Sequence, residues 1–109
     1  MTFSLVARCS QTGMLGVAIA SSSICVVSRC PWVRSGVGAS TTQNVTDPSL
    51  GNLMLNYLEE GLNVQEAIDK TIENNKFINY RQLSLIDAKG NSASFTGSKI
   101  LGRHAVSKG

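Results

Sequence analysis

Thr2 follows the initiator methionine directly, and this position gives it chemical as well as structural meaning. Removal of Met1 would leave a hydroxyl and a free α-amine on one residue, which makes a nucleophile that carries its own general base. Such a group attacks a carbonyl carbon and forms an acyl-enzyme, which water then hydrolyses. The plain alternative is an ordinary strand threonine, because β-branched residues are favoured in strands.

Polar residues end a predicted strand just before a predicted helix, at Thr42, Gln43 and Asn44. Side chains and free backbone amides at such a junction are well placed to meet an anionic ligand, so we expect these residues to bind substrate. The alternative is plain turn and capping chemistry. Arg29 is a candidate partner for a substrate carboxylate or an oxyanion, and its alternative is a solvated surface arginine.

The elements that must position these residues begin with a hairpin. Thr2–Arg8 alternates with period two, Gly13 lies in a turn, and Leu15–Ser22 is nearly continuous in apolar and small residues. A run of the last kind is typical of a strand covered on both faces. Val37–Thr42 is predicted as a third strand. Ile24–Val27 is either a strand or an irregular crossing, and the segment at Pro31 is an edge or a loop.

Two helices follow. Asp47 and Pro48 form a strong helix start, which predicts a helix over Pro48–Glu60 that Gly61 ends. Asn63 and Glu66 have capping-box spacing and open a second helix over Val64–Asn74. The remaining predictions are a hairpin of Tyr80–Ala88 and Ser92–Thr96, a further strand starting at His104–Val106, buried Cys25 and Cys30, and a structural ion pair at Arg81.

These elements predict an α+β domain over residues 1–109, with two helices packed on a largely antiparallel sheet. One helix layer covers only one face, so the far face of the first hairpin needs a second sheet or another copy of the chain.

Composition excludes several classes of function. The formal net charge is +3, and the basic residues are scattered, which argues against nucleic-acid binding. No apolar run approaches the roughly 20 residues of a membrane span, and no signal peptide is recognisable, so we expect a cytoplasmic protein. Three cysteines and one histidine do not make a recognisable metal site, and no cofactor is implied.

Six segments carry a resemblance to a known family, and they are TFSLVAR, TGMLGVAIASS, CPWVRSGVGASTTQNVTDPSLG, EEGLNVQEAID, YRQLSLIDAKGNSASFTG and GRHAVSKG. Together they resemble the domain-of-unknown-function 1028 family over essentially the whole chain. That resemblance implies an Ntn-hydrolase-like αββα sandwich, in which two sheets lie face to face between two helix layers. Family members are about twice as long, so this chain would supply about half of the layers.

The order of elements also resembles a proteasome subunit, and this likeness implies roles for single residues. Thr2 falls on the N-terminal nucleophile, and Arg29 or Arg34 falls near the lysine of proteasome subunits, which makes Arg34 a candidate substrate-binding residue. Arginine is a permanent cation but a poor proton carrier, and Cys9 stands where many relatives carry aspartate. Both positions depart from the proteasome pattern.

The resulting expectation is an Ntn-type amidohydrolase that cleaves a C–N bond in a small molecule. The chain would then act alone through Thr2, or as the α portion of a self-cleaved precursor whose nucleophile begins a second chain after Gly109. A truncated chain explains the same length. The expected partners are a second polypeptide that completes the fold, a β chain, or further copies of this chain. The alternative function is a non-catalytic small-molecule binding or scaffold protein of the same fold.

Overall fold

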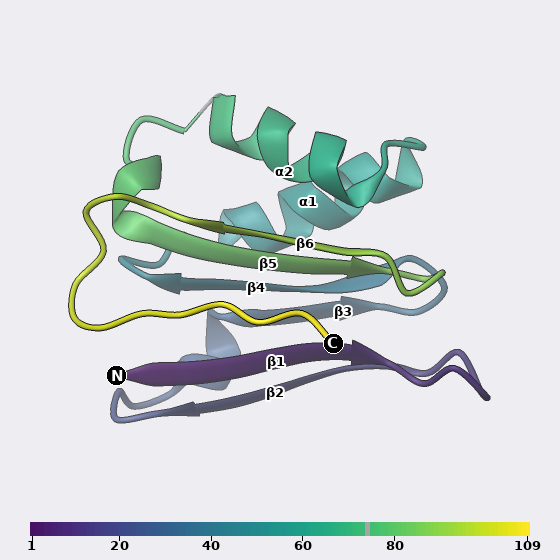
Figure 1. The fold of residues 1–109 in the computed structure, drawn as a ribbon, viewed down its shortest axis with the longest axis horizontal. Coiled ribbons are helices and arrows are strands. Elements are labelled where there is room, and N and C mark those ends of the chain that lie inside the picture. The colour runs from purple at the N-terminus through teal and green to yellow at the C-terminus, as the bar shows by residue number, and fades with distance from the viewer. Residues whose placement is uncertain (74) are drawn as a thin grey trace.

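Two antiparallel sheets and two helices form three stacked layers in the computed structural model, which describes residues 1–73 and 75–109 (Figure 1). The helices cover one face of a four-stranded sheet, and a two-stranded sheet lies against the other face. The predicted α+β class, with two helices on an antiparallel sheet, is confirmed.

The two-stranded sheet is the hairpin of β1 (Thr2–Arg8) and β2 (Leu15–Ser21), in the register that pairs Thr2 with Ser21. Both strands alternate strictly between half-buried and exposed residues. Phe3 and Leu5 are among the exposed residues, and the small residues of β2 lie opposite them. The prediction that Leu15–Ser22 is covered on both faces is therefore wrong within this chain, because only the inner face of the hairpin meets the larger sheet.

The larger sheet has the order β3-β4-β5-β6, all neighbours being antiparallel. Pro31–Arg34 forms the edge strand β3, as the proline suggested, and β4 is central and buried along almost its whole length. β4 begins and ends later than the predicted Val37–Thr42, because Gln43 and Asn44 continue the ladder to β5. The bounds are Gly38–Asn44 for β4, Arg81–Asp87 for β5 and Ser92–Thr96 for β6.

The second helix begins where predicted, and the first begins one residue after the predicted Pro48. The Asp47 carboxylate accepts the Ser49 N–H at 3.1 Å ahead of α1 (Ser49–Glu59). Asn63 and Glu66 each accept the other's backbone N–H, at 2.8 and 3.2 Å, which is the capping box that opens α2 (Val64–Glu73). The predicted end of the second helix at Asn74 lies outside the described residues.

The main core lies between these helices and the four-stranded sheet, where the largest fully buried side chains are Met54, Leu55, Ile68, Leu83 and Leu85. Arg81 closes one end of this core. It is 7% exposed, pairs with Asp47 at 3.9 Å and donates to the Val45 carbonyl at 3.1 Å. The predicted structural role of Arg81 is confirmed.

Two predictions for the connecting segments are wrong. Cys25 adopts a left-handed conformation with φ 58° at the start of the short helix η1 (Val26–Ser28) and is exposed, whereas Cys30 is buried as predicted. Residues His104–Val106 form no strand, since the C-terminal segment runs between β1 and the larger sheet without a strand ladder (Figure 1). A second short helix, η2 (Ile78–Tyr80), precedes β5.

Candidate functional site

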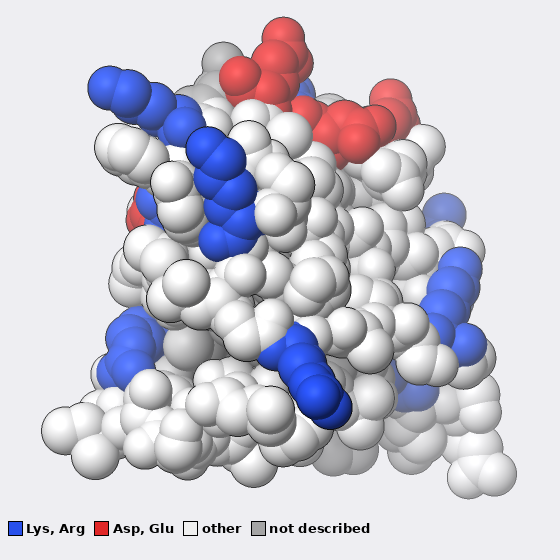
Figure 2. Space-filling model, turned by 60° about the vertical axis from the view of Figure 1, so that its left-hand side comes forward, with Lys and Arg blue, Asp and Glu red and all other residues white. Residues whose placement is uncertain are grey.

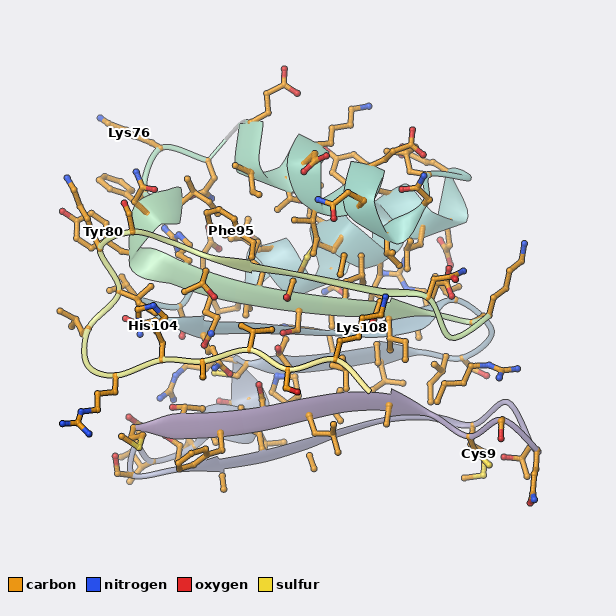
Figure 3. All side chains as sticks on the ribbon, in the orientation of Figure 1. Cys9, Lys76, Tyr80, Phe95, His104 and Lys108 are labelled. Carbon is orange, nitrogen blue, oxygen red and sulfur yellow. The ribbon has the colours of Figure 1, made fainter. Side chains whose placement is uncertain are left out.

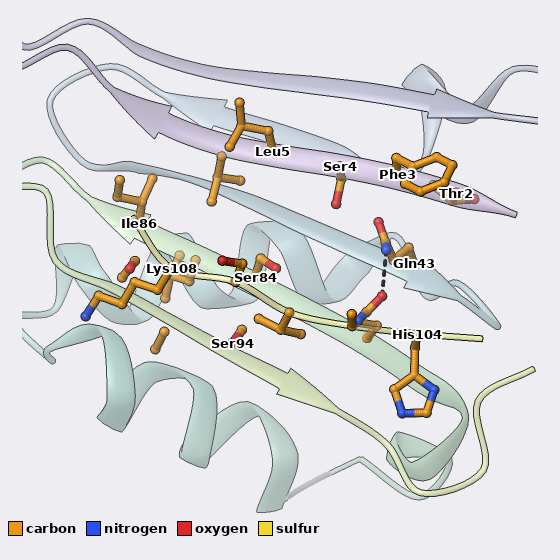
Figure 4. A pocket seen from close by; sticks show the side chains of 18 of the residues that line it. Thr2, Phe3, Ser4, Leu5, Gln43, Ser84, Ile86, Ser94, His104 and Lys108 are labelled. Atoms are coloured by element: carbon orange, nitrogen blue, oxygen red, sulfur yellow. Dashed lines mark hydrogen bonds between the residues drawn. The ribbon is translucent and has the colours of Figure 1, made fainter. Parts of the chain in front are cut away.

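A cavity of about 590 Å³ lies between the two sheets, on the side opposite the main core. Its upper wall is the inner face of β1, and its lower wall is the outer face of β4, β5 and β6 (Figure 4). The C-terminal segment from Arg103 to Gly109 crosses it. The strand side chains in its lining that bear hydroxyl or amide groups are Thr2, Ser4, Gln43, Gln82, Ser84, Ser92 and Ser94.

Strand register explains why the lower wall is polar. The pairing places Gln43 beside Gln82 and Gln82 beside Thr96, in one row across three strands. The Gln43 side-chain N–H donates to Gln82 Oε1 at 2.7 Å, and the Gln82 side-chain N–H donates to Thr96 Oγ1 at 3.2 Å. Gln43 is only 8% exposed, and its own Oε1 has no hydrogen-bond partner.

Thr2 begins β1 at one end of this cavity. Its hydroxyl lies 2.9 Å from the Ser21 hydroxyl, directly across the hairpin. The Met1 ammonium donates to the Ser22 hydroxyl at 2.9 Å, and the Ser22 N–H donates to the Met1 carbonyl at 3.2 Å. With Met1 in place, the nitrogen of Thr2 belongs to a peptide bond, so the hydroxyl lacks the free amine that would serve as its base.

The structure places the two candidate arginines away from the cavity lining. Arg29 donates from Nη1 to the carbonyls of Ile24 and Cys25, at 2.8 and 3.2 Å, and so ties the loop around η1 together. Arg34 lies beside α1, where it donates to Asn56 at 2.8 Å and pairs with Glu59 at 3.2 Å. Of the predicted site residues, only Thr2 and Gln43 share the cavity.

Thr42 and Asn44 flank Gln43 in β4 but are absent from the cavity lining. Successive residues of a strand point to opposite faces, so Thr42 is directed to the helix side, where it is fully buried. Asn44 ends the strand with φ 76°. Its side chain accepts the Leu101 N–H at 3.1 Å and donates to the Leu101 carbonyl at 3.3 Å, which fastens the C-terminal segment to the sheet.

Acidic side chains gather on the helical layer rather than around the cavity (Figure 2). Among the described residues, the cavity lining contains no aspartate or glutamate. The ring of His104 hangs from the C-terminal segment and points away from β1 (Figure 4), so it does not face Thr2. The walls that β1 and the larger sheet provide therefore carry neutral side chains, both hydrogen-bonding and apolar, whereas the C-terminal segment adds the cationic residues Arg103 and Lys108 to the lining. The acidic residues of the helical layer are Glu59, Glu60, Glu66, Asp69 and Glu73.

Sequence reasoning missed Gln82, Ser84 and Ser94 as site residues. The signal was present, because the alternation of the segment that became β5 puts Gln82, Ser84 and Ile86 on one face. What the pattern could not give is the register that brings Gln82 beside Gln43.

The remaining reactive groups lie apart from the cavity. Cys9 lies at the far end of the first hairpin (Figure 3). A hydrogen bond with the Thr12 hydroxyl, followed by contacts with the Thr12 and Gln11 backbone, lowers the pKa of its exposed thiol from the ordinary value. Within residues 1–73 and 75–109, no cluster of three His, Cys, Asp or Glu side chains is arranged to hold a metal ion. No helix in these same ranges is long and apolar enough to cross a membrane.

Comparison with known proteins identifies a family model and a solved structure that are similar to the chain. The model of the family of unknown function DUF1028 matches residues 2–109. The crystal structure of a protein from Silicibacter pomeroyi, which carries the same family model, superposes with a TM-score of 0.88 at 32% sequence identity. That match covers 91% of this chain and 46% of the other, so this chain spans about half the length of its relative. No curated protein matches the chain.

Proposed function

The chain belongs to the DUF1028 family, and on that premise we propose that it is an Ntn-type amidohydrolase that cleaves a C–N bond in a small molecule. The observation that carries the proposal is the position of Thr2, at the start of β1 and in the wall of a polar cavity between two sheets. A hydroxyl at the second position of the chain becomes an N-terminal nucleophile once Met1 is removed.

Removal of Met1 would change two groups beside Thr2. The Thr2 nitrogen becomes a free amine, and the Ser22 N–H loses the Met1 carbonyl to which it donates at 3.2 Å. The Thr2 hydroxyl then attacks the substrate carbonyl carbon while the amine takes its proton. The freed Ser22 N–H is a candidate donor to the resulting oxyanion. The amine returns the proton to the leaving nitrogen, the C–N bond breaks, and water hydrolyses the ester left on Thr2.

The proposed assembly completes an αββα sandwich. The outer face of the β1–β2 hairpin is apolar and uncovered, with Phe3 67% and Leu5 62% exposed. A patch of this kind marks an interaction surface. In the relative, polypeptide of about the same length as this chain lies outside the matched part. We therefore propose that a second polypeptide segment, such as a β chain, supplies the missing helix layer. The free thiols of all three cysteines suit the proposed cytoplasmic location.

Labelling with a small β-lactone tests the role of Thr2, because a strained lactone acylates an activated hydroxyl and leaves a mass increase. Intact mass spectrometry first establishes whether Met1 is absent. We expect one adduct on the wild-type protein and on Thr2→Ser, and at least a hundredfold slower labelling of Thr2→Ala, as for loss of a nucleophile. The exposed hydroxyl of Ser10 in the hairpin turn provides the matched control, and Ser10→Ala should label normally.

A protein that keeps Met1 and resists the lactone would favour the second candidate function, a non-catalytic small-molecule binding or scaffold protein. A cavity lined by hydrogen-bonding side chains, which suits binding as well as catalysis, is the observation that favours this alternative. In that case the same cavity binds a ligand without turning it over.

A further inference from the structure

From the row of Gln43, Gln82 and Thr96 we infer that the cavity selects a ligand carrying a carboxamide or urea N–H over the corresponding ester. This ligand class would be the substrate class of the proposed amidohydrolase. Only the identity of the bond that reacts depends on the proposed function. Its basis is one unpaired acceptor, the Oε1 atom of Gln43, in a buried side chain on the cavity wall.

The hydrogen bonds along the row have a direction. Gln43 donates to Gln82 at 2.7 Å, and Gln82 donates to Thr96 at 3.2 Å. Each amide is therefore held by its neighbour, and the Gln43 oxygen is left at the head of the row. A buried acceptor without a donor is unfavourable, because it has lost water and gained nothing in return. A ligand N–H on Gln43 Oε1 would remove this penalty.

The opposite wall fits the same class of ligand. Ser4 points from β1 toward Gln43 (Figure 4), and its hydroxyl is able to donate to a ligand carbonyl. A carboxamide held by Gln43 would thus lie under β1, the strand that carries Thr2. An ester lacks the N–H that Gln43 Oε1 would accept.

Hexanamide and methyl hexanoate form a matched pair of probes for this selectivity. Each is titrated into the full-length ¹⁵N-labelled protein while the side-chain amide resonances of Gln43 and Gln82 are followed by NMR. We expect hexanamide to shift these resonances saturably and to bind about tenfold more tightly than the ester, the usual effect of one buried hydrogen bond. The ester is the more apolar probe, so hydrophobic transfer alone would favour it.

Gln43→Met keeps the length of the side chain and removes its amide, so it should abolish the preference for hexanamide. Gln65→Met is the matched control, because Gln65 is exposed on α2 and its side-chain amide donates to Asp69 at 2.9 Å. Equal binding of hexanamide and methyl hexanoate to the wild-type protein would overturn the inference, and so would an undiminished preference in Gln43→Met. If Gln43→Met does not fold, the relative affinities of hexanamide and methyl hexanoate for the wild-type protein still test the inference.

The test separates this inference from the proposed catalysis. Thr2→Ala should keep the preference for hexanamide while losing lactone labelling. A wild-type protein that reacts with the lactone but shows no such preference would contradict the inference alone. A protein that prefers hexanamide but is inert to the lactone would contradict only the catalytic role of Thr2.

Discussion

Asp87 organises the turn between β5 and β6 with a single carboxylate. It accepts the Lys89 N–H at 2.9 Å, the Asn91 N–H at 2.9 Å and the Asn91 side-chain amide at 3.0 Å. Partial burial acts to raise the pKa of Asp87, but the hydrogen bonds from Asn91 and Lys89 outweigh it and hold the pKa below the ordinary 3.8. The charged form of this residue is therefore favoured by folding.

A carboxyl group whose pKa is lowered on folding stabilises the protein above its unfolded pKa, and this contribution disappears as the pH falls through the folded pKa. We expect Asp87→Ala to lower the free energy of unfolding by about 1–2 kcal/mol at neutral pH, as for the loss of charge-assisted hydrogen bonds. Urea unfolding between about pH 6 and about pH 2 should show the gap from wild type closing below 3.8.

Glu60→Ala removes an exposed carboxylate just after α1 and serves as the control for Asp87. A gap between Asp87→Ala and wild type that stayed constant across the acid range would contradict the assigned role of the charge.

At the residue scale, the site could be predicted only in part. Thr2 and Gln43 were identified because a hydroxyl next to the N-terminus and a polar strand end are visible in the sequence. Thr42 was grouped with Gln43, although the two point to opposite faces of β4. Which face meets the cavity depends on the second sheet, and the local pattern does not contain that information.

At the scale of elements, α1 approaches β3 closely enough that one position admits only glycine. A Cβ atom on Gly51 would overlap the indole ring of Trp32, whereas a Cβ on Gly16 would meet open space. The absence of a side chain at Gly51 therefore sets how closely helix and strand approach each other.

Gly51→Ala sets two effects against each other. Alanine gains about 1 kcal/mol in helix propensity, while overpacking costs about 1–3 kcal/mol and more where a rigid ring is involved. The overlap falls on the indole, so we expect a net loss of about 2 kcal/mol, read from the urea midpoint. Gly16→Ala should change the midpoint little, and a Gly51→Ala protein as stable as wild type would show that Trp32 moves aside freely.

The helices were easier to predict from the sequence than which faces of each strand are covered. Both helix starts followed from local capping chemistry, which needs only neighbouring residues. The exposure of Gly16, Ala18 and Ala20 could not be predicted, because a run of small apolar residues looks the same whether one or both faces are covered. The strand expected at His104–Val106 required a pairing partner that the described chain does not provide.

At the scale of the whole molecule, the three layers leave one apolar surface open. This outer face of the β1–β2 hairpin contains Phe3, Leu5 and Ala7, with Ala20, Ala18 and Gly16 respectively opposite them. The proposed second polypeptide would cover it. Without that cover, the surface should drive self-association.

Phe3→Ser combined with Leu5→Ser should reduce both self-association, measured by light scattering during gel filtration, and the fluorescence of a bound hydrophobic dye. Ile24→Ser combined with Val27→Ser changes two other exposed apolar residues, 84% and 72% exposed, outside this face. The control should behave like wild type. If both double variants reduce association equally, the outer face is no more than ordinary apolar surface.

The pairing of β4 with β5 has a consequence for how the chain folds during synthesis. β4 pairs with β3 on one side and with β5 on the other, and β5 leaves the ribosome only after α1 and α2 have been made. The β1–β2 hairpin and both helices rely on local contacts and are able to form early. The four-stranded sheet forms only when the long chain segment between β4 and β5 closes. This loop closure costs entropy, which makes β4–β5 pairing the slow step of folding.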